Sequence, residues 1–289
     1  MIKIVTDAEA NLTPELMERY DIKTMPLWIH FEDGAYQEGH NITREGFYER
    51  LIDSGEFPKT SQASVGQFLE LYRPLLEAGH EILSIHIASE LSGTYQSAVG
   101  AAQQLPGAKI SVFDSRYAAT FQALMVWRAV EWAEQGLSRE EIVARLQGMI
   151  PHLHNFFMVD TLEYLRRGGR IGGASALLGT LLQVKPILTL KDGKIEVYDK
   201  MRTRKRALAR LKQLALEAAS GARAVDLAVL HVRCPQVAHL LADKLAAELA
   251  PERKMVDLIG PGIGVHVGPG AVGVCIYAEP GDDEGQPHA

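Results

Sequence analysis

The first half of the chain alternates short β-rich runs with segments of helical pattern, and this alternation limits the folds that it can adopt. Residues 2–7 are typical of a strand, and a helix follows in which Thr13 is the predicted N-cap and Pro14 the first residue. Strands are predicted again at 81–89 and 109–115, and a helical segment follows each of them. Such an order is typical of a mainly parallel sheet with helices on its faces, so the sequence predicts an α/β fold.

The second half has a different order of elements. A strand and two helical segments, the second at 172–184, precede a hairpin that Asp192-Gly193 predicts, because this pair lies between two β-patterned runs. A helix, a strand and a further helix follow, and the region 262–279 reads as strand broken by glycines. We therefore expect a mixed sheet in this half, again with flanking helices.

Two domains are predicted from these two patterns. We assign residues 1–154 to an N-terminal α/β domain and 155–280 to a C-terminal α/β domain, and we interpret the polar residues 281–289 as a disordered tail. A cleft between two such domains is the default position for a ligand.

The composition excludes several classes of protein. A formal net charge of −6 argues against a general nucleic-acid binder, which usually has a basic balance. Cys234 and Cys275 lie in apolar surroundings without metal-ligand spacing, so we expect buried free thiols, no metal site and a reduced compartment. The first residues lack the features of a signal peptide, and no run approaches the ~18 apolar residues that cross a bilayer. The expected location is cytoplasmic, without stable membrane insertion.

Hydroxyl side chains gather at three predicted turns from strand to helix. The first turn contains Thr60, Ser61, Gln62 and Ser64, the second Ser92 and Thr94 on either side of Gly93, and the third Ser115 and Thr120 after Asp114. In a parallel sheet such turns lie at the carboxyl edge, where ligands bind, and a helix N-terminus there offers unpaired N–H groups to an anion. The alternative for each turn is an ordinary N-cap, since Ser and Thr are preferred caps.

Candidate partners for an anion come from the second half. His266 is flanked by glycines, which allow its backbone to approach other atoms closely, although a buried histidine satisfied by backbone is the alternative. Arg170, among glycines, can offer a planar fork of donors to an oxyanion. The basic run 200–212, which contains Arg202, is either a solvated helix face or a docking patch for an acidic or nucleotide-bearing partner.

Several motifs in succession resemble those of the DegV family, which includes the fatty-acid-binding subunits of bacterial fatty acid kinase. The similar segments are TDAEANLTPEL, KTSQASVGQF, IASELSGTYQSA, VFDSRYAA, TLEYLRRGGRI, LLQVKPIL, DKMRTRKRAL and IGVHVGPGAVG. They follow the family's order from about Ile2 to Tyr277. The resemblance implies a DegV-like fold of two α/β domains, with a long-chain fatty acid buried between them.

The resemblance also implies a role for each candidate residue. The fatty-acid carboxylate would be bound by Thr60, Ser61, Ser92, Gly93, Thr94 and His266. Arg170 and Arg202 would contact a partner or a phosphate, and the partner would be a separate kinase that converts the carboxylate into an acyl phosphate. Two positions depart from the family's usual pattern, because Ala8-Glu9 stands in place of two serines and Lys59 in place of a proline.

Three functions are compared on these grounds. The favoured one is a cytosolic carrier, not itself an enzyme, that has no cofactor besides its bound fatty acid and touches membranes at most transiently. The alternative is a lipid or ester hydrolase with Ser92 as nucleophile, His266 as base and Asp114 as a conceivable acid, but the glycine two residues before the serine is missing. A phosphate or nucleotide module is disfavoured because there is no P-loop.

Overall fold

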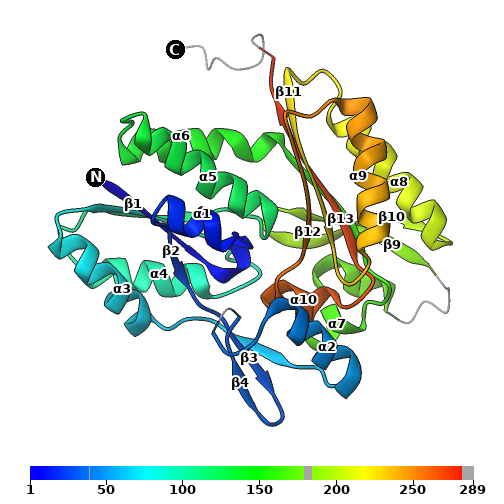
Figure 1. Ribbon diagram of the computed structural model, residues 1–289, viewed down its shortest axis with the longest axis horizontal. Helices are drawn as coiled ribbons and strands as arrows, with labels where there is room; N and C mark the ends of the chain where they lie inside the picture. Colours follow the sequence, from blue (N-terminus) through cyan, green and yellow to red (C-terminus); the bar gives the residue numbers. More distant parts are fainter. Residues whose placement is uncertain (39, 179–183, 282–289) are drawn as a thin grey trace. The chain divides into compact units, whose positions relative to one another are not determined.

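A computed structural model describes residues 1–38, 40–178 and 184–281 of the 289-residue chain (Figure 1). Its contacts divide the chain into two units. The first comprises Met1–Ile150 together with Gly260–Val265, and the second comprises Pro151–Ile259 and the residues from His266 onward. The main stretch of the first unit thus ends at residue 150, four residues before the predicted boundary at 154. Six later residues, Gly260–Val265, also belong to the first unit.

The first unit is built on a parallel sheet, as the alternating pattern predicts. In spatial order its strands are β2 (Lys23–Met25), β1 (Ile2–Asp7), β6 (Glu81–His86) and β7 (Ile110–Asp114). Helices α3 (Val65–Glu77) and α4 (Thr94–Gln103) cover one face, and α5 (Thr120–Glu134) and α6 (Arg139–Met149) cover the other (Figure 1). Val5 and Ile82 share a core with Phe68 of α3, and the crossovers bring the carboxyl ends of β1, β6 and β7 to one edge.

The first unit also contains short helices. They are the 3-10 helix η1 (Ala8–Ala10), α1 (Pro14–Arg19) and α2 (Arg44–Ser54), and the 3-10 helix η2 (Ile150–His152) begins at the last residue of its main stretch. The predicted cap Thr13 accepts a hydrogen bond from the Leu16 N–H, and Thr43 caps α2 in the same way. Ser64 forms a capping box with Gln67, which satisfies donors at the start of α3.

A separate antiparallel sheet of three short strands completes the first unit. Its order is β4 (Gly34–Tyr36), β3 (Trp28–Phe31) and β5 (Lys59–Ser61). The guanidinium of Arg50 on α2 lies 4.2 Å from the ring centre of Phe31 and 4.9 Å from that of Tyr36, which packs the helix against this sheet. The sequence indicates a loop at 59–61, and pairing with β3 makes it a strand instead.

The second unit is a six-stranded mixed sheet, which confirms the predicted mixed class. In spatial order its strands are β10 (Lys194–Met201), β9 (Lys185–Lys191), β8 (Leu153–Met158), β13 (Val272–Glu279), β11 (Ala224–His231) and β12 (Arg253–Leu258). Helices α8 (Arg204–Ala218) and α9 (Pro235–Leu249) lie side by side on one face (Figure 1). Asp192 and Gly193 both have positive φ, 49° and 78°, and so form the predicted hairpin turn.

One prediction in this half is wrong, and another holds only in part. The region 262–279 is not all strand, because α10 (Pro261–Val267) is a helix that begins at a proline, and only β13 follows as strand. The predicted helix at 172–184 is a 3-10 helix, η3 (Gly172–Leu177), in its first part. A short helix, α7 (Glu163–Arg167), precedes it and ends at Gly168 as its glycines indicate. Residues 179–183 and the predicted tail from 282 lie outside the described residues.

No helix within the described ranges is both long enough and apolar enough to span a bilayer.

Candidate functional site

The turn between β6 and α4 places two hydroxyls at an uncapped helix start. The N-cap of the ten-residue helix α4 is Gly93, which has no side chain that could cap the first turn. Ser92 Oγ lies 2.9 Å from Thr94 Oγ1 and accepts a hydrogen bond from the Thr94 N–H at 3.3 Å. The N–H groups at the start of a helix and its positive end favour a bound anion, and the two hydroxyls add donors.

The first and second hydroxyl turns lie against each other. A Cβ atom at Gly93 would lie 2.3 Å from both Nε2 and Oε1 of Gln62, so the Gln62 side chain already fills the space beside that glycine. Gln62 Nε2 also donates to Ser97 Oγ at 3.5 Å. Gln62 follows β5 directly, so this contact brings the TSQ segment to the start of α4. The sequence places both turns at one sheet edge but gives no sign of this particular contact.

Thr60 and Ser61 occupy opposite faces of β5. Thr60 pairs with Ile29, which is 1% exposed, whereas Ser61 pairs with Trp28 on the other face. Ser61 Oγ lies 2.8 Å from His30 Nε2, and Ser61 itself is exposed. Because neighbouring side chains of a strand point in opposite directions, the two hydroxyls cannot both reach one carboxylate. Thr60, on the buried face, is the better placed of the two.

The third turn is occupied by its own backbone. Asp114 Oδ1 accepts the N–H groups of Ser89 and Arg116, at 3.3 and 2.9 Å. Ser115 Oγ donates to the Tyr117 carbonyl and accepts the Tyr117 N–H. These contacts hold the loop in shape. Ser115 therefore has a structural role, and Asp114 accepts hydrogen bonds from backbone N–H groups.

His266 is in contact with the glycines of the LRRGGR motif. Within the second unit, a Cβ at Gly168 would lie 2.1 Å from His266 Nδ1, so only glycine fits against the ring. Burial, and next the charge of Arg170, lower the pKa of His266 to about 4. Arg170 Nη1 donates to the Gly168 carbonyl at 2.8 Å, which holds it at this position. The imidazole is therefore neutral near pH 7 and has one N–H donor.

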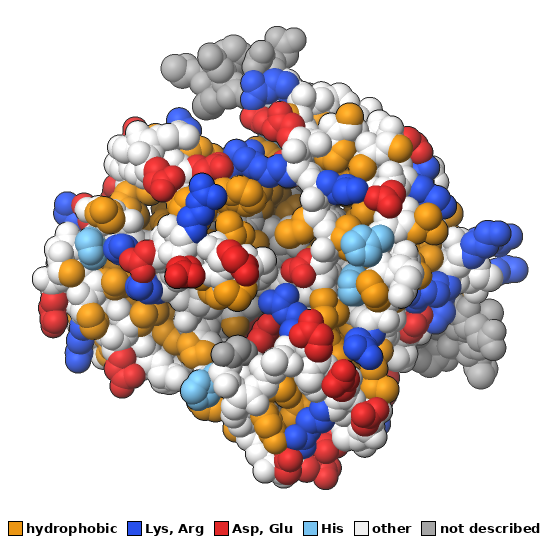
Figure 2. Space-filling view, in the orientation of Figure 1, with side chains coloured by type: hydrophobic (Ala, Val, Ile, Leu, Met, Phe, Trp, Pro, Cys, Tyr) orange, Lys and Arg blue, Asp and Glu red, His pale blue; other side chains and the backbone are white. Residues whose placement is uncertain are grey.

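The basic run is partly neutralised within the second unit. Arg204 Nη1 lies 2.7 Å from Asp160 Oδ1 and donates to the Gly270 carbonyl, and Arg210 Nε lies 2.9 Å from Asp199 Oδ2. Arg202 is exposed in the turn between β10 and α8. On the face shown in Figure 2, Lys and Arg side chains are interspersed with Asp and Glu. Arg202 is thus an exposed cation in a run whose other arginines are partly paired with acids.

Glu9, one of the departures from the family pattern, is buried in the first unit. It is 6% exposed, and burial, the Asp7 charge and a hydrogen bond with Asp7 raise its pKa well above the ordinary value of 4.5. A Cβ at Gly262 of α10 would lie 3.4 Å from Glu9 Cγ, so the carboxyl side chain packs beneath that helix. Glu9 therefore has a structural place that favours its protonated form.

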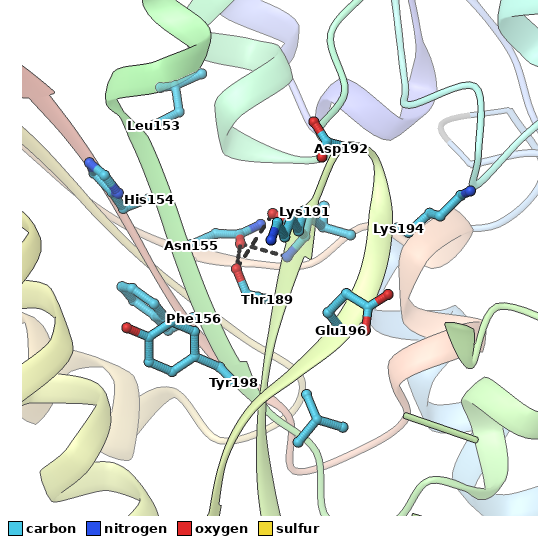
Figure 3. A pocket seen from close by; sticks show the side chains of 12 residues that line it. Leu153, His154, Asn155, Phe156, Thr189, Lys191, Asp192, Lys194, Glu196 and Tyr198 are labelled. Atoms are coloured by element: carbon cyan, nitrogen blue, oxygen red, sulfur yellow. Dashed lines mark hydrogen bonds between the residues drawn. The ribbon is translucent and has the colours of Figure 1, made fainter. Parts of the chain in front are cut away.

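A pocket of about 790 Å³ lies on the second unit, where β8, β9 and β10 come together (Figure 3). Asn155 Oδ1 accepts hydrogen bonds from Thr189 Oγ1 and the Leu190 N–H, both at 2.8 Å, and so links β8 to β9 beside the pocket. Phe156 and Tyr198 contact each other edge to face on its wall. None of the residues that the sequence assigns to the carboxylate lines this pocket.

Cysteines and acidic clusters show no sign of metal chemistry in the part of the chain that is described. No group of three or more His, Cys, Asp or Glu side chains there could hold a metal ion. Cys234 and Cys275 are free thiols, and burial raises the pKa of Cys275 to about 12. Burial also raises the pKa of Cys234, against the opposing effect of Arg204.

The fold is that of an α/β protein of two units, in which a turn carrying two hydroxyls stands at a helix start. The chain belongs to the DegV family, since a model described as an uncharacterised protein of that family matches residues 1–279. A DegV domain-containing protein of Streptomyces coelicolor is 39% identical over 277 residues, which cover 95% of this chain and 98% of the relative.

Solved structures of the family share the fold. A DegV family protein from Thermus thermophilus, described by its fatty acid binding, superposes with a TM-score of 0.90 at 36% identity and covers 96% of this chain and 99% of its own. A stearic-acid-binding protein from Eubacterium ventriosum superposes with a TM-score of 0.87 at 30% identity, with the same two coverages. These matches confirm the predicted fold class and family.

Proposed function

We propose that this chain is a carrier that binds a long-chain fatty acid by its carboxylate and presents that group to a separate fatty acid kinase. The observation that carries the proposal is the turn at Ser92–Thr94, where two hydroxyls adjoin an uncapped helix start beside the TSQ segment. Solved relatives described as fatty-acid-binding support a fatty acid as the anion's source.

The proposed roles follow from the chemistry of each group. The bound carboxylate replaces the hydrogen bond between Ser92 and Thr94, so that both hydroxyls donate to it, and Thr60 adds a third hydroxyl from the buried face of β5. His266, whose pKa near 4 keeps it neutral, donates one N–H, so the carboxylate is held by hydrogen bonds and not by an ion pair with the imidazole. Ser61, which lies next to His30, is left out of this set.

Burial of the acyl chain supplies most of the affinity in this proposal. Each buried CH₂ contributes about 0.8 kcal/mol, so a chain of sixteen to eighteen carbons contributes on the order of ten kcal/mol before ordering losses. The hydroxyls offset the cost of removing the carboxylate from water and fix its orientation. Phosphoryl transfer then takes place in the kinase, and this chain contributes only binding and orientation.

Removal of the hydroxyls tests the binding proposal. We expect the wild-type protein, purified from bacteria, to carry one long-chain fatty acid that native mass spectrometry and lipid extraction identify. Ser92→Ala and Thr60→Val are each expected to weaken palmitate binding roughly ten- to hundredfold, because a hydrogen bond to a charged group contributes about 1.5–3 kcal/mol. The double variant is expected to be purified without lipid.

Ser61→Ala is the matched control, since it removes a neighbouring hydroxyl from the opposite face of the same strand. It should retain the lipid. The carrier proposal fails if the wild-type protein neither carries nor binds a fatty acid. Ester turnover abolished by Ser92→Ala alone would favour the hydrolase alternative.

The kinase partnership has its own test at the exposed Arg202. We expect Arg202→Ala to leave palmitate affinity unchanged and to lower the rate at which a bacterial fatty acid kinase phosphorylates the bound acid, by roughly tenfold. Arg206→Ala, which removes another exposed cation of the basic run, should have a smaller effect. If Arg202→Ala abolishes lipid binding instead, Arg202 is a ligand contact and the docking role is wrong.

A further inference from the structure

A chain of buried polar groups runs through the centre of the first unit. His86 Nδ1 lies 2.8 Å from Asp7 Oδ2, and His86 Nε2 lies 2.7 Å from Ser84 Oγ. Tyr72 Oη donates to the same Ser84 Oγ at 2.7 Å. All four residues are at most 1% exposed. Such groups are stable in a core only if each donor and acceptor is satisfied, so their arrangement is constrained.

Only one distribution of protons satisfies this chain with a neutral histidine. The Asp7 carboxylate accepts, so His86 Nδ1 carries a proton and donates it, which leaves Nε2 as an acceptor. Tyr72 donates a hydrogen bond to Ser84 Oγ, so the hydrogen of the Ser84 hydroxyl points to His86 Nε2. The order Ser-His-Asp is that of a hydrolase triad, but Ser84 is fully buried and Tyr72 occupies it, so no substrate reaches it.

The carboxylate of Asp7 also holds the backbone that leads to Ser92. Its Oδ2 atom accepts the Ile87 N–H at 3.1 Å. The next N–H, of Ala88, donates to the Tyr117 carbonyl at 2.8 Å, and that of Ser89 donates to Asp114. Three consecutive N–H groups are therefore fixed, the first by the end of β1 and the other two by the end of β7 and the turn that follows it.

The loop then closes on itself before the hydroxyl turn. The Ser92 N–H donates to the Ala88 carbonyl at 3.2 Å, so the position of Ser92 follows from that of Ala88. Asp7 cannot rotate away, because its other oxygen, Oδ1, accepts a hydrogen bond from Gln122 Nε2 at 2.7 Å. The same Gln122 nitrogen donates to Thr6 Oγ1 at 3.1 Å.

We propose that Asp7 and His86 are positioning residues that fix the Ser92–Thr94 turn in its ligand-binding geometry. The proposal rests on the carrier function, in which that turn binds the carboxylate. Neither residue touches the ligand. Asp7 acts through the Ile87 N–H, and His86 holds the Asp7 oxygen in place. A turn that is already ordered before binding spends less free energy on ordering, so its affinity is higher.

A pair of substitutions at His86 separates positioning from packing. The amide nitrogen of asparagine reaches the place of Nδ1, whereas the terminal amide of glutamine reaches the place of Nε2, where its oxygen can accept from Ser84. His86→Asn therefore keeps a donor to Asp7, and His86→Gln keeps the contact to Ser84 and loses the donor. With palmitic acid as probe, we expect the dissociation constant of His86→Asn to stay within threefold of wild type. His86→Gln should bind at least tenfold more weakly, and Asp7→Asn likewise.

Nuclear magnetic resonance gives a readout that does not depend on ligand. In the wild-type protein the His86 proton should reside on Nδ1, and a proton on Nε2 overturns the proposal. The amide resonances of residues 92–94 should move in His86→Gln and stay in His86→Asn. Tyr72 lies at the other end of this hydrogen-bonded series from Asp7, so Tyr72→Phe is the control that should leave the amide resonances of residues 92–94 unchanged.

The outcomes distinguish the two proposals. Wild-type protein that binds no palmitate contradicts the carrier function, and the amide resonances then still decide whether Asp7 and His86 order the turn. Palmitate binding by the wild-type protein with equal affinity in His86→Gln overturns the positioning role alone. Should His86→Gln not fold, the Asp7→Asn affinity and the wild-type tautomer decide.

Discussion

Gly264→Val is expected to destabilise the first unit by about 3 kcal/mol, because the added side chain has no room against a rigid neighbour. A Cβ at this position would lie 2.0 Å from Tyr48 Oη and 2.8 Å from Cζ, and Tyr48 is 0% exposed. An aromatic ring in a filled core cannot swing away as a surface side chain does. Chemical unfolding followed by circular dichroism should show the loss as a lower midpoint.

Gly148→Val is the matched control. It makes the same replacement in a helix of the same unit, but a Cβ at Gly148 meets nothing within 4 Å. Valine has a slightly higher helix propensity than glycine, so this variant should be as stable as the wild type or slightly more. If the two variants lose equal stability, steric contact with Tyr48 is not what requires glycine at position 264.

Glu9→Gln is expected to remove a pH dependence from the stability of the first unit. Glu9 has a raised pKa in the folded protein, so between 4.5 and that raised value the folded state binds more protons than the unfolded state. The wild-type free energy of unfolding therefore falls with rising pH in this window, by up to about 1.4 kcal/mol per pH unit from this group. Glutamine stays neutral and keeps an N–H donor for Asp7.

Urea unfolding of the wild type and of Glu9→Gln between pH 4 and 9 measures this effect as the difference between their free energies of unfolding. The stability of Glu9→Gln relative to wild type should be constant below about pH 4.5, rise above it and then level off. Glu15→Gln is the control, because backbone and Thr13 hydrogen bonds lower the pKa of Glu15 and place its titration below 4.5. A difference for Glu9→Gln that does not vary with pH contradicts the assignment of a protonated Glu9.

The main sheets could be predicted because their signals are local. A buried parallel strand such as β6 reads as an apolar run, and helix starts such as that at Thr43 carry a capping residue. Helix α10 has only Pro261 as a start signal, and Gly262 and Gly264 lower its helix propensity. It is stable because those glycines allow close packing on Leu27 and Tyr48, which no local pattern shows.

The site shows the same limit. Family motifs indicate the hydroxyls, but the separation of Thr60 from Ser61 follows from the pairing of β5 with β3, for which the segment 59–61 has no strand signal. The contact between Asp7 and His86 joins residues 79 positions apart, and each reads in the sequence as an ordinary polar residue at a strand end. Long-range contacts of this kind depend on the sheet order, which spacing alone does not define.

The membership of Gly260–Val265 in the first unit has a consequence for synthesis on the ribosome. Residues 1–150 are made early, but the segment that packs on Leu27, Tyr48 and Glu9 leaves the ribosome only after residues 151–259 of the second unit have been made. Domains usually fold in order as they emerge. Here the first unit can be completed only after most of the second unit has been synthesised.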